Sequence, residues 1–353
     1  MSQQVCQMSR GSARRSRRGA RFSRTLARSP ANLALGSGGL PLMLRVISKW
    51  SNVVWLYGAV AILLAWVLGQ VCSDRWWWSQ WLLWIPGPLV CLINLVGAVW
   101  LLAPRHDSQR HLRRLLALGA VLAAGFSLRD DIGWSCTAPG GDTVSIAYLN
   151  ARWPGQSARE FTPALASVDA DLFVVGNCGR LGEAPEADRW LPADALPYRV
   201  GPFAVASGIA LESSRLIYAG ELGTVAVIQT VPLPAWPAGI RIGLFDLPSD
   251  PLLARAQLAQ RLRADLMAVG IGELDVAVGD FNMTFGWSLQ HLLPGMELGR
   301  TCGWQGTFPR QLPLWRLDHI LVRPPRQLHQ STSFDPAVAG HRGIRGHLSP
   351  AAD

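Results

Sequence analysis

Acidic residues are scarce in the first third of this 353-residue chain. Residues 1–130 contain 16 Lys and Arg but only 3 Asp and Glu, so they carry a formal charge of +13 while residues 131–353 carry −4. Lysine itself is nearly absent, since Lys49 is the only one. Proteins that bind duplex DNA strongly present a basic folded surface. A mildly acidic C-terminal part therefore argues against duplex nucleic acid as a partner.

Cysteine is also sparse, with 6 residues and no C-x-x-C pair, which excludes zinc-knuckle spacing. Three of the cysteines, Cys136, Cys178 and Cys302, fall in the C-terminal part. One disulfide among these three is compatible with the sequence. Buried free thiols are the favoured interpretation.

Large apolar side chains are few in residues 1–45, which are rich in Arg, Ser and Gly. This composition predicts a disordered basic arm. Two alternatives stay open: translation starts at Met43, just before the first apolar segment, or the arm is a tail that binds nucleic acid.

Long apolar runs dominate residues 46–130, which we predict to be a transmembrane region with two to three helices. Val53–Val71 is a charge-free run long enough to span about 30 Å of hydrocarbon. Trp81–Ala103 is a second charge-free run, with Pro86-Gly87-Pro88 near its start. Leu115–Leu128 is shorter and fits either a buried helix or a short third span, which we favour.

Charge distribution around these runs predicts their orientation. The basic arm and the loop 104–114, which holds four Arg and one acid, should lie in the cytoplasm by the positive-inside rule. Three spans would then place the C-terminal domain on the periplasmic or extracellular side of the inner membrane of a bacterium. If Leu115–Leu128 does not span, that domain faces the cytoplasm.

From residue 131 the hydropathy pattern becomes that of an α/β domain, predicted over residues 131–353. Apolar, strand-like runs occur at Val144–Leu149, Asp171–Val175, Val225–Thr230, Ile240–Phe245, Leu274–Val278 and Leu317–Val322. Helical patterns occur at Ala158–Ala170 and Leu252–Val269. Many strands with few helices favour packed sheets over a doubly wound fold.

The segment Gly279-Asp280-Phe281-Asn282 ends one of these buried strands. Because side chains alternate along a strand, Asp280 and Asn282 should point the same way, where they could hold a metal ion, a water molecule and a phosphate oxygen. On its own the segment is equally good turn chemistry.

Further polar residues sit at strand ends in the same manner: Asn150, Asp318 with His319, and His347 near the chain end. This ordered set resembles the endonuclease/exonuclease/phosphatase superfamily over roughly residues 143–350. The resemblance implies a four-layer α/β/β/α sandwich of two mixed sheets, here preceded by about three transmembrane helices. It is most similar to bacterial membrane-anchored members.

The resemblance also implies a role for each matching residue. Asp280 would orient or activate the attacking water and Asn282 would hold a phosphate oxygen. Asp318 would orient His347, which would act beside the phosphate. The implied metal site comprises Asn150, Asn177 and Asp246, and the implied metal is Mg²⁺ or Mn²⁺. His319, which follows Asp318 on a strand, should point away and be structural.

Three positions depart from the family pattern. Asn177 stands where the family has a metal-binding Glu, Asp246 where it has a His, and Gly346 where it has the Asp of Ser-Asp-His. The expected function is a membrane-anchored, metal-dependent phosphoesterase of unknown substrate, with an impaired site. The alternative is a catalytically inactive pseudoenzyme that acts as a binding or scaffold module.

Overall fold

The computed structural model describes residues 39–102, 110–130, 132–134, 136, 141–152, 163, 165–179, 196–299, 301–337 and 339–350. The chain divides into two compact units, Met1–Ser51 and Asn52–Asp353. The predicted basic arm at 1–45 lies almost wholly outside the described residues. The second unit contains both apolar helices and strands, so the boundary expected near residue 130 stays a prediction.

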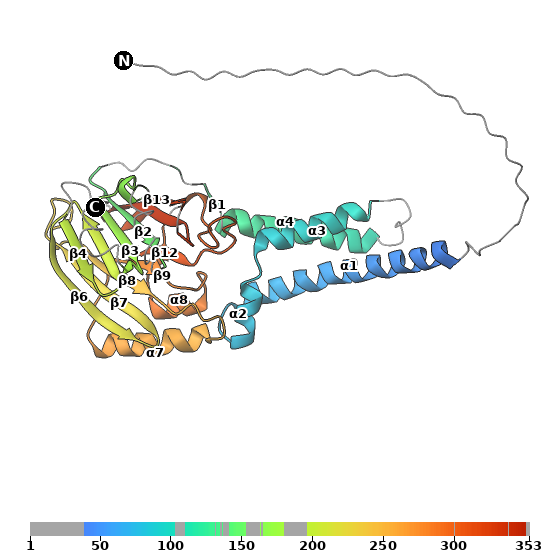
Figure 1. Ribbon diagram of the computed structural model, residues 1–353, viewed down its shortest axis with the longest axis horizontal. Helices are drawn as coiled ribbons and strands as arrows, with labels where there is room; N and C mark the ends of the chain where they lie inside the picture. Colours follow the sequence, from blue (N-terminus) through green and yellow to red (C-terminus); the bar gives the residue numbers. More distant parts are fainter. Residues whose placement is uncertain are drawn as a thin grey trace, which may run out of the picture. The chain divides into compact units, whose positions relative to one another are not determined.

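Among the described residues, four helices precede the strands: α1 (Gly39–Cys72), α2 (Trp77–Leu83), α3 (Gly87–Trp100) and α4 (Arg110–Asp130) (Figure 1). Two stretches, Val53–Cys72 and Arg110–Arg129, are long and apolar enough to cross a membrane. The predicted run Trp81–Ala103 is not one helix, because α2 and α3 meet at 63°. Pro86 and Pro88 explain the break, since proline cannot donate the backbone hydrogen bonds that a continuous helix needs.

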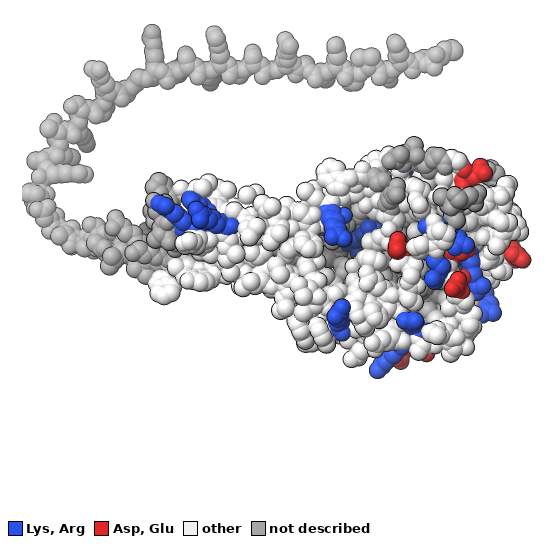
Figure 2. Space-filling model, turned by 180° about the vertical axis from the view of Figure 1, so that it is seen from behind, with Lys and Arg blue, Asp and Glu red and all other residues white. Residues whose placement is uncertain are grey.

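The C-terminal part of α1 packs with α3 and α4 through two apolar clusters. One contains Leu63, Trp66, Val90 and Ala123, and the other contains Leu56, Ala59, Ala98, Leu101 and Leu116. Apolar side chains also face outward from all three helices, among them Leu64, Leu92 and Val121. Figure 2 shows a basic group at the outer end of this helical region and few charged side chains between that group and the globular part, which carries both signs of charge. Helices that are apolar all round fit a lipid environment.

Two six-stranded mixed sheets form the globular part. The first has the order β10-β12-β9-β8-β7-β6 and the second β13-β14-β2-β3-β5-β4. The pairs β8–β9 and β2–β3 are parallel, and the other neighbours are antiparallel. The strands are β2 (Val144–Asn150), β3 (Leu172–Gly176), β4 (Leu196–Val200), β5 (Phe203–Ser207), β6 (Leu211–Gly220), β7 (Gly223–Thr230), β8 (Arg241–Asp246), β9 (Val276–Asp280), β10 (Glu297–Leu298), β12 (Asp318–Val322), β13 (Gln327–Phe334) and β14 (Gly343–Ser349). The α/β class and the two mixed sheets are as predicted.

The main core lies between the sheets, where side chains such as Ile146, Val174, Leu244 and Val278 interdigitate. On the outer face of the first sheet, α7 (Arg255–Ala268) and α8 (Trp287–Leu292) bury a second apolar cluster that includes Leu262. A third cluster around Leu149 covers the outer face of the second sheet. Of the helix predicted there, 158–170, residues 158–162 and 164 lie outside the described residues, and the described part is helical only at 163, 165 and 166.

A disulfide joins Cys136 to Cys302, so the expectation of free thiols is wrong for this pair. The strands β1 (Ile132–Trp134) and β11 (Cys302–Trp304) pair in antiparallel register beside it. This pairing brings cysteines 166 positions apart into contact, which spacing alone does not reveal. Cys178 is buried and lies outside this disulfide, as expected.

The segment from Ser73 to Trp84 docks on the globular part. The Gln80 side chain donates to the carbonyls of Pro251 and Leu253 and accepts from the Arg255 backbone N–H. The Asp74 carboxylate accepts from the Ser288 N–H at 2.9 Å. Since Gln80 and Asp74 are fully buried, these bonds fix the segment against α7 and α8.

Candidate active site

Three carboxylates lie in one row across the first sheet. Asp246 ends β8 and pairs in register with Asp280 at the end of β9, which pairs in turn with Asp318 at the start of β12. The parallel and antiparallel pairings place all three at the same edge. These three residues, which the sequence placed at strand ends, therefore lie side by side in the structure.

Gly279 makes the close approach of β8 and β9 possible. Its φ is 155°, and a Cβ built on it would lie 1.9 Å from the Phe245 carbonyl oxygen. Any larger residue would push the strands apart at the position that fixes Asp280 beside Asp246. Steric contact with β8 thus explains why the Gly-Asp-x-Asn segment begins with glycine.

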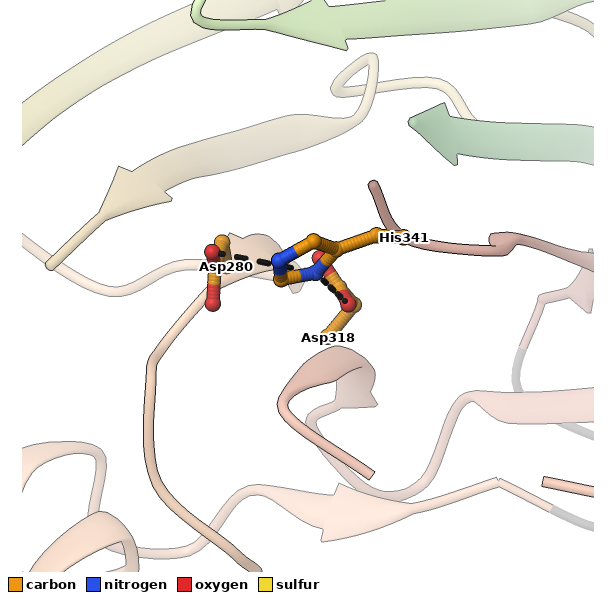
Figure 3. A group of neighbouring side chains, drawn as sticks. All are labelled: Asp280, Asp318 and His341. Atoms are coloured by element: carbon orange, nitrogen blue, oxygen red, sulfur yellow. Dashed lines mark hydrogen bonds and ion pairs between the residues drawn. The ribbon is translucent and has the colours of Figure 1, made fainter. Parts of the chain in front are cut away.

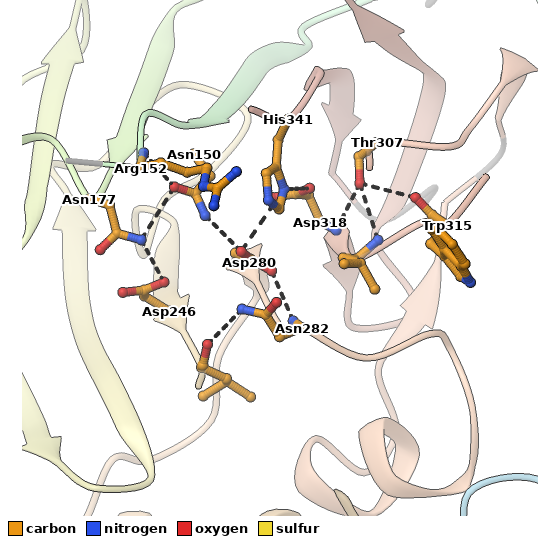
Figure 4. A network of polar contacts seen from close by, with 12 residues as sticks. Asn150, Arg152, Asn177, Asp246, Asp280, Asn282, Thr307, Trp315, Asp318 and His341 are labelled. Carbon is orange, nitrogen blue, oxygen red and sulfur yellow. Dashed lines mark hydrogen bonds and ion pairs between the residues drawn. The ribbon is translucent and has the colours of Figure 1, made fainter. Parts of the chain in front are cut away.

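Asn150 ends β2 and Asn177 directly follows β3 in the second sheet, and both meet the carboxylate row from the other side (Figure 4). Asn177 donates to Asp246 at 2.9 Å and to Asn150 at 3.2 Å, and Asn150 donates to Asp280 at 2.6 Å. The two sheets are therefore bridged at one edge by a chain of amides and carboxylates. Asn282 accompanies it, with its side chain donating to the Leu247 carbonyl at 2.7 Å.

The histidine that meets Asp318 is His341, not His347 (Figure 3). Nδ1 of His341 lies 2.8 Å from the Asp318 carboxylate and 4.0 Å from that of Asp280. His347 lies within β14, opposite Ser145 at the start of β2 and thus at the far end of the sheet from Asn150. The predicted pairing of Asp318 with His347 is wrong, because the chain end forms a strand.

The sequence contains a pattern that favours His341 over His347 as the partner of Asp318. Ile344 and Leu348 are core residues of β14 and alternate with Arg345 and His347, as in a strand with one buried face. That alternation places His347 on the outer face and leaves His341 in the loop before the strand. His319 is structural, as predicted, since it is fully buried and contacts the Met283 carbonyl at 2.9 Å.

A cleft of about 730 Å³ opens over this network. Its lining includes the site residues Asn150, Asn177, Asp246, Asp280, Asn282 and His341. It also includes residues that the sequence did not single out, notably Arg152, Arg255, Trp84 and Trp315. Their types carry no distinctive motif, and only the fold brings them together.

Arg152 occupies space left by Gly340. A Cβ at Gly340 would lie 2.5 Å from Cδ of Arg152. Because His341 is the site histidine, the residue that precedes it is Gly340 and not Gly346. The Asp of the family's Ser-Asp-His pattern is therefore replaced by glycine at position 340. A cationic side chain stands there instead.

Burial and mutual repulsion determine the electrostatics of the site. Burial raises the pKa of Asp246 to about 6, although the hydrogen bond from Asn177 opposes this. Burial and the charge of Asp318 raise the pKa of Asp280. Burial alone would lower the pKa of His341, but the charge and hydrogen bond of Asp318, with the charge of Asp280, raise it to about 9. The site is short of positive charge, and His341 is cationic at neutral pH.

The donor set suits a hard divalent cation. Asp246 and Asp280 offer carboxylate oxygens, and Asn150 and Asn177 offer amide oxygens. Ligand atoms of Asp280, Asp318 and His341 also lie within 4.8 Å of one another. Nδ1 of His341 is already hydrogen-bonded to Asp318, so we assign Asp318 to orienting the imidazole. We assign the carboxylate and amide oxygens named above to the cation.

The solved structures that are similar to this chain share little sequence with it. An endonuclease/exonuclease/phosphatase family protein from Bacteroides thetaiotaomicron is 13% identical, with 61% of this chain and 100% of that chain covered and a TM-score of 0.46. A mannosyl-6-phosphatase from Bacteroides thetaiotaomicron is 15% identical, with 58% and 99% covered and a TM-score of 0.46. A mutant of beta toxin from Staphylococcus aureus with bound magnesium ions is 10% identical, with 59% and 100% covered and a TM-score of 0.39.

No curated protein sequence is similar enough to this chain to count as a relative. A family model, however, matches residues 147–340, a range that begins within β2 and ends just before His341. It spans more than half of the chain and contains the carboxylate row and both asparagines. The chain belongs to the endonuclease/exonuclease/phosphatase family.

Proposed function

We propose that this protein is a membrane-anchored, metal-dependent phosphoesterase. The observation that carries the proposal is the carboxylate row Asp246–Asp280–Asp318, with the Asp318–His341 pair at one end and the two asparagines opposite. Members of this family hydrolyse phosphoesters, and the cleft is large enough for such a group.

Each group has a task that its surroundings support. Asp318 fixes the orientation and charge of the His341 imidazole, whose other nitrogen can donate to a phosphoryl oxygen. Asp280 can accept a proton from an attacking water once its own proton has left. Asp246 and Asp280, with the asparagine oxygens, would hold Mg²⁺ or Mn²⁺. A bound divalent cation supplies charge stabilisation to the phosphoryl group. Arg152 adds a further positive charge beside the position of the phosphoryl group.

The test is hydrolysis of bis(4-nitrophenyl) phosphate by the purified full-length chain. We expect turnover that requires Mg²⁺ or Mn²⁺ and that Asp280→Ala abolishes. Asp265→Ala, which removes an exposed carboxylate from α7, is the matched control and should keep the parent rate. Metal-dependent turnover that is the same in Asp280→Ala would sink the proposal.

A second candidate is a binding module without catalysis, favoured by Asn177. Asn177 has a φ of 50°, in the left-handed region that asparagine tolerates better than glutamate. Its amide donates to Asp246 and Asn150, so the position is built as a neutral bridge. Asn177→Glu together with Gly340→Asp should create activity in an inactive parent. An active parent would rule this candidate out.

We further propose that the globular part lies outside the cytoplasm. The end of α1, the start of α3 and the end of α4 all lie against the globular part or one another, since Gly69 contacts Leu82, Gly87 contacts Ser127 and β1 directly follows α4. Three passes of alternating direction fit this arrangement. The disulfide supports it too, because disulfides persist in oxidising compartments.

A further inference from the structure

The docking segment, residues 73–84, is bonded to two loops that line the active-site cleft. One is the loop 247–254 between β8 and α7, and the other is the loop 305–317 before β12. The first loop directly follows Asp246, and the second directly precedes Asp318. One segment of the helical region therefore holds the loops at both ends of the carboxylate row.

Gln80 and Arg255 together bind four backbone carbonyls of the loop 247–254. These carbonyls belong to Pro248, Asp250, Pro251 and Leu253. Gln80 also accepts from the Arg255 backbone N–H at 3.0 Å, and the Arg255 guanidinium lies over the Trp84 ring, 5.7 Å from its centroid. Gln80 and Arg255 are both buried, so water cannot replace these bonds and the loop depends on the docking segment.

The loop 247–254 is bonded in turn to the Gly-Asp-x-Asn segment. The Leu247 N–H donates to the Asp280 carbonyl at 2.9 Å, and the Leu247 carbonyl accepts from the Asn282 side chain at 2.7 Å. A shift of this loop would therefore move Asn282 relative to the carboxylate row.

Trp315 attaches the second loop to the same segment. Its indole N–H donates to the Trp84 carbonyl at 2.8 Å. Its own carbonyl accepts from the N–H groups of Thr307 at 2.8 Å and Phe308 at 2.9 Å. The position of Trp315 therefore determines where Thr307 and Phe308 lie.

Thr307 and Phe308 hold the Asp318–His341 pair. The Thr307 hydroxyl accepts from the Asp318 N–H at 3.3 Å, and the Thr307 carbonyl accepts from the Arg342 N–H at 2.8 Å (Figure 4). The Phe308 ring packs against the His341 imidazole, with centroids 4.9 Å apart. The loop 305–317 thus supports both partners of the pair.

We propose that the docking segment positions both halves of the active site, with Gln80 and Trp315 as positioning residues. The inference rests on the proposed function and names a means by which the same site is regulated. The docking segment lies in the chain between a candidate membrane span in α1 and the helix α3. A rearrangement of the helical region would therefore reach the carboxylate row through these two attachments, and activity depends on how that region is packed.

The first experiment measures kcat with bis(4-nitrophenyl) phosphate and Mn²⁺ on the full-length protein in phosphatidylcholine nanodiscs, at a temperature where every variant is folded. Gln80→Ala and Trp315→Phe each remove one attachment. We expect each to lower kcat by about tenfold or more, since a small misplacement of reacting groups can cost about 100-fold in rate. Gln290→Ala and Trp78→Phe change exposed side chains of the same types and should keep the parent rate.

The double variant tests whether the two attachments act through one segment. Gln80 and Trp315 are bonded to different loops, so independent effects on kcat would multiply to about 100-fold or more. Because either change loosens the same segment, we expect the double variant to lose less than about threefold beyond the slower single variant.

The second experiment needs no turnover. Hydrogen–deuterium exchange is followed by mass spectrometry for peptides that cover 247–255 and 305–318. Among the described residues, the Gln80 side chain is bonded only to 251–255, yet we expect Gln80→Ala to speed exchange about tenfold in both peptides. Asp250→Ala removes a bond within the first loop, to the Leu252 N–H, and should affect 247–255 alone.

The two experiments separate this inference from the proposed function. No turnover in the parent, with coupled exchange of the two loops, would overturn the phosphoesterase and keep the docking segment as the element that holds both loops. Turnover in the parent that neither single variant lowers would overturn the positioning role and keep the phosphoesterase. Multiplied losses in the double variant, with faster exchange confined to 247–255 in Gln80→Ala, would do the same.

Discussion

At the scale of single residues, the site is defined by which histidine meets Asp318. We expect His341→Ala to lower the rate of phosphoester hydrolysis by about 10²–10⁴-fold, the range for a group that assists proton transfer. His347→Ala removes the same side chain from the outer face of β14 and should leave the rate near that of the parent. The reverse ranking in a steady-state assay would restore the assignment made from the sequence.

Asp246 should destabilise the protein when no cation is bound. The folded-state pKa of about 6 lies above the ordinary aspartate value of 3.8, so the wild type loses stability as pH rises through this window. Asp246→Asn should therefore raise the free energy of unfolding by about 1–3 kcal/mol at pH 8 and have little effect at pH 4. The measurement is thermal unfolding in chelator at both pH values.

Adding Mn²⁺ provides the control for this prediction. Cation binding offsets the buried charge, so it should stabilise the wild type more than Asp246→Asn. If the variant is less stable than the wild type in chelator at pH 8, the assignment of Asp246 to the cation is contradicted.

Residue identities at strand ends were predictable, but their partners were not. Asp280 and Asn150 come at the end of apolar runs and Asp318 near the start of one, so their place at a sheet edge follows from pattern alone. The choice between His341 and His347 depended on recognising β14, which has only two bulky core residues, Ile344 and Leu348, around Gly346. Arg152 could not be foreseen, because its role depends on contact with Gly340, which is remote in the chain.

At the scale of elements, α2 is a docking segment and not part of a straight span. Gln80→Ala would leave the Arg255 N–H and two carbonyls without their partner, which should cost about 1–3 kcal/mol. We expect a lower unfolding temperature and faster proteolysis between residues 247 and 255. Gln290→Ala, which truncates an exposed glutamine, should change neither. Equal behaviour of the two variants would contradict the docking role.

The strand and helix patterns predicted the elements with one strongly buried face well. β2, β3, β7, β8, β9, β12 and α7 all overlap the runs identified from hydropathy, with ends that differ by at most three residues. β6 was not predicted, because most of its residues are exposed and its sequence, Leu211–Gly220, lacks a buried face. The break between α2 and α3 was signalled by Pro86-Gly87-Pro88, but their angle depends on the docking of α2 on the globular part.

At the scale of the whole molecule, the Cys136–Cys302 disulfide closes a loop of 166 positions. Cys302→Ser should lower the free energy of unfolding by about 2–4 kcal/mol. Treating the parent with dithiothreitol should reproduce this loss, whereas the variant should be insensitive to the reductant. Equal stability of parent and variant in non-reducing buffer would mean that the pair is not bonded in the native protein.

The same disulfide determines how the protein can be taken apart. Cys136 follows α4 almost directly, whereas Cys302 lies deep in the C-terminal sequence. A protease that cuts between them, for example just before β2, separates the polypeptide into two pieces that stay covalently joined. Shedding of the globular part from its helices by such a cut therefore requires a reductant as well as a protease.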